Sequence, residues 1–160
     1  MQYLFRTNAY ASPSVDGVIT NIATISGAGL ASPLEVTSTI SAQEAANLSI
    51  SKSICPDTVV ENGEITYTFV IQNTGNQATV ATDDVIITDL FDPILNPITV
   101  QFNGTTWTAP TNYTYDTTTG LFQTVAGQVI VPAAAYTRDE TTGQWITSPG
   151  TSVLRVTGTV

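Results

Sequence analysis

Lys52, Asn21 and Asp89 are three polar residues that the sequence places among apolar ones. Around Lys52 the run LSISKSI alternates serine with apolar residues, so Lys52 shares one face of a predicted strand with leucine and isoleucine. The same period of two puts Asp89 beside the apolar residues of VIITD. It also puts Asn21 on the more apolar face of ITNIATI, although Ile22 opposes that assignment.

These three residues could react with one another. An ammonium group in a core is costly unless it is paired, so Lys52 needs a partner, and the acid and the amide are the candidates. One outcome is an ion pair, or an inward charge that discourages mispairing of the strand. The other is what a resemblance to the Ig-like domains of Gram-positive pilins and adhesins implies, namely an isopeptide bond, in which the Lys52 amine displaces ammonia from Asn21 while Asp89 assists proton transfer. Burial favours the neutral amine and the neutral acid that this reaction needs.

Other chemistry has little support in the sequence. There is no histidine, P-loop or GxSxG motif, so we expect no enzyme activity and no cofactor. Asp83, Asp84, Asp89 and Asp92 do not form a calcium-binding loop, so we expect no specific metal. The single cysteine, Cys55, is either a buried or half-buried thiol or the site of a disulfide between two copies of the chain.

Charge and hydropathy exclude several classes of partner. Thirteen carboxylates against four basic residues give a net charge of −9, which repels nucleic acid. No run of 18 apolar residues occurs, so we expect no membrane insertion. The first residues lack the basic and then apolar layout of a secretory signal, so either a signal was removed or the protein is made and used without that route.

Composition and alternation predict an all-β protein in two parts. Threonine, valine, isoleucine and serine are abundant, and only 11% of the residues are charged. Residues 1–47 are predicted to hold an arm, a strand at 18–26 and a linker with a short strand near 34–40. Residues 48–160 are predicted to form one antiparallel immunoglobulin-like β-sandwich of short strands, one of them at 128–131.

The order of the strands suggests donation of a strand between copies. The segment 18–26 lies behind a long linker, and the last strand, 152–160, stops where a closing partner would be expected. We therefore predict that 18–26 completes the sandwich as a donated strand, and that the last strand offers the acceptor edge. The predicted donor residues are Val18, Ile19, Asn21, Ile22, Ala23 and Ile25. The predicted acceptor residues are Leu154, Val156 and Val160.

Several stretches carry a resemblance to a known family. LSISKSICPDTVVENGEITYTFVIQNTGN, VIITDLFDPIL and PGTSVLRVTGTV resemble the bacterial conserved repeat catalogued as domain of unknown function 11. VDGVITNIATISG is similar to the segment that closes the preceding repeat in tandem arrays, but here it stands at the front of a single domain. The resemblance implies an Ig-like fold and a structural or adhesive role on a bacterial or archaeal surface. In similar Ig-like domains of Gram-positive pilins and adhesins, a buried lysine forms an isopeptide bond with an asparagine.

Two functions follow from these observations. The first is a structural subunit of an extracellular fibre, on a cell or an endospore surface, whose copies join head to tail by donor-strand complementation. Its partner is then a further copy of the same chain. The alternative is a monomeric adhesive or stalk module of a bacterial surface protein, in which 18–26 folds back on its own domain. The linker of residues 27–47 is long enough to allow this second arrangement.

Overall fold

A computed structural model describes residues 18–27, 29–41 and 43–160 of the chain. Strands are its main regular structure, with one short 3₁₀ helix and no α-helix in the described residues. The elements are β1 Val18–Ile25, β2 Leu34–Ser41, β3 Leu48–Cys55, β4 Glu64–Asn73, η1 Ala81–Asp83, β5 Thr88–Leu90, β6 Ile98–Phe102, β7 Thr105–Trp107, β8 Tyr113–Tyr115, β9 Leu121–Thr124, β10 Ala135–Arg138, β11 Trp145–Ser148 and β12 Gly150–Thr159. The described residues hold no helix that is both long and apolar enough to cross a membrane.

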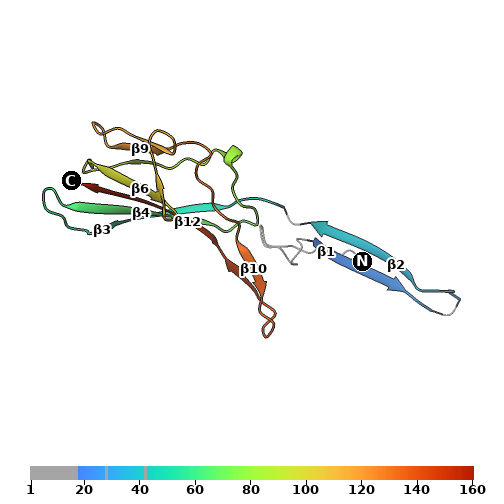
Figure 1. The fold of residues 1–160 in the computed structure, drawn as a ribbon. Helices are drawn as coiled ribbons and strands as arrows, with labels where there is room; N and C mark the ends of the chain where they lie inside the picture. The colour runs from blue at the N-terminus through green and yellow to red at the C-terminus, as the bar shows by residue number, and fades with distance from the viewer. Residues whose placement is uncertain (1–17, 28, 42) are drawn as a thin grey trace.

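The strands form two larger sheets and two separate hairpins, all antiparallel. A five-stranded sheet has the order β3-β4-β12-β6-β7, and a three-stranded sheet has the order β5-β9-β8. Together they enclose one apolar core (Figure 1). The hairpins β1-β2 and β10-β11 project from this body in different directions (Figure 1). The prediction of an all-β antiparallel protein is confirmed.

Alternating residues explain the two longest strands. β4 and β12 each have ten residues, and every second side chain is buried along most of their length. Side chains of a strand point alternately to its two faces, so one face of each strand belongs to the core. The core consists of Ile65, Tyr67, Phe69, Ile71, Ile87, Phe91, Leu95, Val100, Phe102, Trp107, Tyr113, Phe122, Val129, Val131, Leu154 and Val156.

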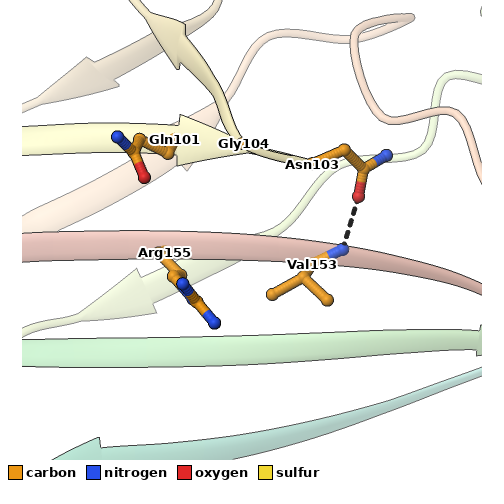
Figure 2. Close-up of a pocket in the computed structure, with 5 residues that line it drawn as sticks. All are labelled: Gln101, Asn103, Gly104, Val153 and Arg155. Carbon is orange, nitrogen blue, oxygen red and sulfur yellow. Dashed lines mark hydrogen bonds between the residues drawn. The ribbon is translucent and has the colours of Figure 1, made fainter.

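The turn between β6 and β7 follows the sequence prediction. Asn103 and Gly104 both have positive φ, at 49° and 81°, as a two-residue hairpin turn requires. Asn103 Oδ1 also accepts a hydrogen bond from the backbone N–H of Val153 at 2.8 Å (Figure 2). A small pocket lies beside this turn. Gln101, Val153 and Arg155 of the sheet line it together with the two turn residues.

Two segments differ from their predicted structure. Residues 128–131 form no strand, although Val129 and Val131 are buried and Val131 exchanges hydrogen bonds with Thr79. The segment therefore contributes side chains to the core without pairing as a regular strand. Residues 34–41 form a full strand, β2, which pairs with β1 along its whole length. The segment 18–26 is thus one arm of a hairpin rather than a single strand.

Candidate assembly site

The hairpin β1-β2 has one apolar and one polar face. Residues paired across antiparallel strands lie on the same face of the sheet, so the register assigns each side chain to a face. The apolar face consists of Ile19, Asn21, Ala23, Ile25, Leu34, Val36, Ser38 and Ile40. The opposite face consists of Val18, Thr20, Ile22, Thr24, Glu35, Thr37, Thr39 and Ser41. Asn21 therefore lies on the apolar face, paired with Ser38, and Val18 and Ile22 are apolar exceptions on the polar one.

The apolar face of the hairpin is open to solvent. Ile25 is 63% exposed and Val36 is 68% exposed, and Leu34 and Ile40 are also more than half exposed. The hairpin extends away from the sandwich, so no part of the body covers it in Figure 1. Exposed apolar surface of this kind is a candidate site of interaction.

The chain is fixed to the sandwich between the hairpin and β3. The N–H of Asn47 donates to Oδ1 of Asn73, and the N–H of Ala45 donates to Oδ1 of Asn76, both at 2.9 Å. Asn73 is fully buried, and its Nδ2 donates to two backbone carbonyls. At Gly75 a Cβ would lie 2.7 Å from the nitrogen of Asn47, so this contact requires glycine. Residues 43–47 are therefore a docked segment rather than a free linker.

The second candidate surface is the strand β3. It is an edge strand that pairs with β4, and every one of its residues is exposed. Its register places Lys52 opposite Phe69 and Ile50 opposite Ile71, both of which are core residues. One face of β3 thus belongs to the inner side of its sheet, yet Ile50 is 56% exposed because the three-stranded sheet does not extend over it.

We call this second surface the open flank. It consists of the inner-facing residues Leu48, Ile50, Lys52 and Ile54 of β3, together with Asp89 and the free edge of β5. Within the described residues, β5 pairs with β9 on one side and has no partner strand on the other. The open flank therefore exposes both apolar side chains and an unpaired strand edge, which is the combination that an added strand can satisfy.

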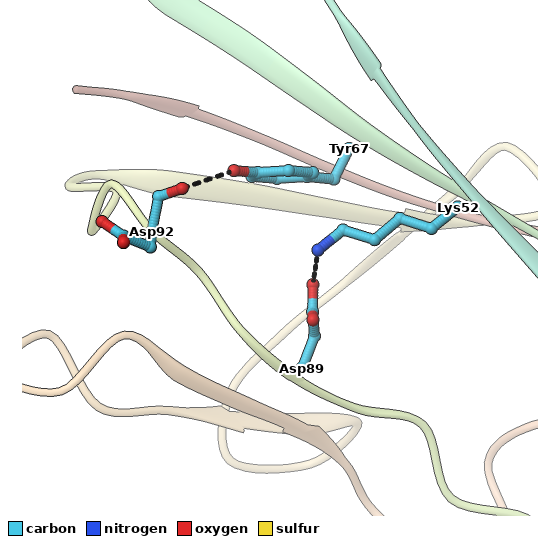
Figure 3. Close-up of polar contacts among 4 residues, drawn as sticks. All are labelled: Lys52, Tyr67, Asp89 and Asp92. Atoms are coloured by element: carbon cyan, nitrogen blue, oxygen red, sulfur yellow. Dashed lines mark hydrogen bonds and ion pairs between the residues drawn. The ribbon is translucent and has the colours of Figure 1, made fainter.

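Lys52 and Asp89 form an ion pair across the open flank (Figure 3). The ammonium group also lies over the ring of Tyr67, 4.4 Å from its centroid, within the distance for a cation–π contact. Phe91 stacks on Tyr67 with 4.8 Å between the ring centroids, and it belongs to the segment that follows β5. The pair is therefore held against aromatic rings that join the two sheets.

The ion pair of Lys52 and Asp89 is only partly shielded from solvent. The side chain of Lys52 is 39% exposed, and that of Asp89 is 19% exposed. Asp89 Oδ2 is buried and accepts no hydrogen bond from the described residues, so Lys52 is its one partner among them. Burial raises the pKa of Tyr67, and the neighbouring carboxylates of Asp89 and Asp92 raise it further. The Tyr67 hydroxyl donates to the carbonyl of Asp92 at 3.4 Å, as Figure 3 shows.

The structure brings together two of the three predicted reactive residues. Lys52 and Asp89 point inward and meet, as the alternation in the sequence predicts. Asn21 lies on the projecting hairpin, and its side chain makes no hydrogen bond within the described residues.

Cys55 is an exposed free thiol, so the prediction of burial is wrong for it. The aromatic support from Tyr67 escaped the sequence analysis, although the alternation in EITYTFVI places it on the inner face.

The predicted acceptor edge is wrong. Leu154 and Val156 are fully buried in β12, which pairs with β4 on one side and with β6 on the other. Val160 packs partly against the core and exchanges backbone hydrogen bonds with residues 62 and 63. A strand with both edges paired cannot accept another strand. Among the described residues, the edge strands of the two sheets are β3 and β7 in one and β5 and β8 in the other, and the open flank lies at β3 and β5.

Comparison with family models, curated proteins and solved structures finds no match to this chain. The resemblance to the bacterial surface repeat therefore stays a prediction from the sequence.

Proposed function

We propose that this chain is a structural subunit of a protein fibre, in which each copy places its β1-β2 hairpin on the open flank of the next copy. The observation that carries this proposal is the presence in one chain of two exposed apolar surfaces whose strands are equal in length. One is the apolar face of the hairpin, and the other is the open flank. Joining them removes apolar surface from water and gives the free edge of β5 a partner strand.

The number and length of the strands support this match. The five-stranded sheet faces a sheet of only three strands, and the hairpin would add two. β1, β2 and β3 each have eight residues, so the hairpin can extend along the whole of β3. With β1 next to β5, the second sheet would have the order β2-β1-β5-β9-β8 and would cover the open flank.

The docked segment favours a second copy over the same chain as the acceptor. In a monomeric stalk module, the hairpin would turn back toward β3 of its own domain. Residues 43–47 are held to the loop after β4 by hydrogen bonds from both sides, and the hairpin leaves from there away from the body (Figure 1). These hydrogen bonds hold the start of the domain in the arrangement in which the hairpin points away from β3. An intermolecular contact keeps all of them.

The two surfaces are different, which determines the form of the assembly. A contact between unlike surfaces is heterologous, and it repeats without limit unless the rotation closes a ring. A linear head-to-tail fibre follows. The resemblance to surface repeats favours an extracellular place for it, on a cell or an endospore, with further copies of the chain as its partner.

Two defective variants test the proposal. Val36→Asp places a charge on the apolar face of the hairpin, and Ile50→Asp places one on the open flank. Each side chain is more than half exposed in the subunit, so each variant should remain folded. We expect the unaltered chain to form filaments in electron micrographs and each variant alone to be monomeric.

Mixing the two variants decides between the two functions. The intact hairpin of the Ile50→Asp chain should bind the intact flank of the Val36→Asp chain, and the product should be a one-to-one dimer that grows no further. Light scattering after size-exclusion chromatography measures its mass. A control variant, Ile22→Asp, alters the polar face and should still form filaments. Monomers in the mixture, together with a monomeric unaltered chain, would refute the fibre and favour the stalk module.

A further inference from the structure

We propose that the joined subunits become covalently linked through an isopeptide bond between Lys52 of one copy and Asn21 of the next, with Asp89 as the proton carrier. This inference rests on the proposed function, because only the docking of a hairpin on the open flank brings Asn21 to Lys52. Three independent features of the structure support it: the position of Lys52, the position of Asn21 and the polar content of the two surfaces.

Lys52 is already placed as a nucleophile at the open flank. Its Nζ lies over the Tyr67 ring and contacts Asp89 Oδ2, while part of the side chain still faces solvent. The rings of Phe69 and Phe91 also lie within 5.7 Å of the ammonium group. A hairpin bound on the flank would cover the part of this pair that is exposed.

Asn21 is placed to be that covering group. It lies on the apolar face of the hairpin, and its carboxamide has no hydrogen-bond partner in the described chain. Docking would bury the carboxamide, which costs free energy unless it meets a polar partner. The inner-facing polar groups of the open flank are Lys52 and Asp89. Asn21 is the fourth of eight residues in β1, and Lys52 is the fifth of eight in β3, so a hairpin centred on β3 brings them together.

The reaction balances with these three side chains alone. Loss of water around the pair favours the neutral amine and neutral acid, so a proton passes from Lys52 Nζ to Asp89. The amine then attacks Cγ of Asn21, and a bond forms between Nζ and Cγ. The bond from Cγ to Nδ2 breaks, and Asp89 supplies the proton with which Nδ2 leaves as ammonia. The Asp89 carboxylate then takes the second proton that Nζ loses, so the product is a neutral amide and a neutral acid. Each linkage releases one ammonia and needs no oxidant or energy source.

Filaments of the full chain provide the test. Boiling in detergent with reductant should leave a ladder of multimers, which excludes a disulfide through Cys55 as the cause. Digestion at arginine, lysine and glutamate should yield a branched peptide that joins the segments around residues 21 and 52 with the loss of one ammonia. Filaments grown from a mixture of ¹⁵N-labelled and unlabelled subunits should contain branched peptides of mixed label, because the linked residues belong to different copies.

Variants separate docking from linkage. Lys52→Arg keeps the positive charge beside Asp89 but removes the nucleophile, so filaments should form and then dissolve to monomers in hot detergent. Asn21→Ser should behave in the same way. Asp89→Ala should form filaments whose ladder appears much more slowly or not at all, and linkage at the unaltered rate would refute its role as proton carrier.

The outcomes for the unaltered chain are distinct. Filaments that dissolve in hot detergent, or a digest that holds only the unlinked peptides, would overturn the isopeptide bond and leave the fibre in place. Branched peptides without mixed label would show linkage within one chain and overturn the intermolecular bond. Absence of filaments together with absence of the mixed-variant dimer would refute the proposed function and this inference with it.

Discussion

Ile25 and Ile22 offer a matched test of which face of the hairpin is buried in the fibre. Both are isoleucines of β1, and their side chains are 63% and 57% exposed in the subunit. Ile25 lies on the apolar face and Ile22 on the opposite one. Serine at either position should change the stability of the isolated subunit by no more than about 0.5 kcal/mol, because neither side chain is in the core.

The effect on assembly should differ between the two. Burying a whole isoleucine side chain stabilises by about 1.5–3 kcal/mol. Ile25 still has 63% of its surface to bury, so Ile25→Ser should weaken each joint by about 1–2 kcal/mol. A factor of ten corresponds to 1.4 kcal/mol, so the subunit concentration that remains unassembled at equilibrium should rise about 5- to 30-fold. Ile22→Ser should leave that concentration within about twofold of the starting value.

The assay needs reversible assembly, so both changes are made in an Asn21→Ala chain, in which no isopeptide bond can form. Filaments are sedimented at equilibrium, and the protein left in the supernatant is measured. Urea unfolding of the unassembled subunits provides the control for stability. Equal effects of the two serines would mean that the hairpin does not bind through its apolar face, and the assignment of the interface would be wrong.

Three further predictions concern the isolated subunit. Lys52→Met should lower the free energy of unfolding by about 1–2 kcal/mol, because it leaves a buried oxygen of Asp89 without a partner, and adding Asp89→Ala should recover most of that loss in urea unfolding. Gly75→Ala should displace residues 43–47, so proteolysis within them should become faster while the core stays resistant; an unchanged rate would contradict the docked segment. Hydrogen bonds from the side chain and backbone of Thr118, and from the side chain of Thr119, lower the pKa of Asp116 to about 2. The contribution of Asp116 to stability is therefore complete above its pKa in the unfolded chain, and it is lost as the pH falls through about 2. Titration of this carboxyl by NMR with the pKa of an ordinary aspartate would refute this prediction.

The sequence predicted which way the side chains of a strand point better than it predicted which strands lie next to one another. Alternation alone places Lys52 and Asp89 inward, and the structure brings them together, because a strand has a fixed period of two. The same alternation in Leu154 and Val156 does not say whether a strand is central or at an edge, since inward residues repeat in both cases. The segment 152–160 was predicted as an acceptor edge because it comes last in the order of strands, whereas its two partners place β12 in the middle of the sheet.

The candidate site depends on contacts that no local pattern reveals. The pairing of β1 with β2 determines the face of Asn21, and it resolves the ambiguity that Ile22 creates in the sequence. The exposure of Ile50 follows from the width of the opposite sheet, which is a property of the whole fold. The docking of residues 43–47 depends on two asparagines that lie about thirty positions further along the chain.

The docked segment also determines how the molecule bears tension. A pull on the hairpin enters the body at residues 43–47 and passes directly into β3, which begins at Leu48. β3 is bonded to β4 over its whole length, and hydrogen bonds between antiparallel strands are perpendicular to the strands. Force along β3 therefore loads these bonds in shear, so that many must fail together, whereas a pull across the strands would open them one after another. β3 is thus pulled in the direction in which its hydrogen bonds resist best. The hydrogen bonds of residues 43–47 receive the pull first and would break before β3 slides.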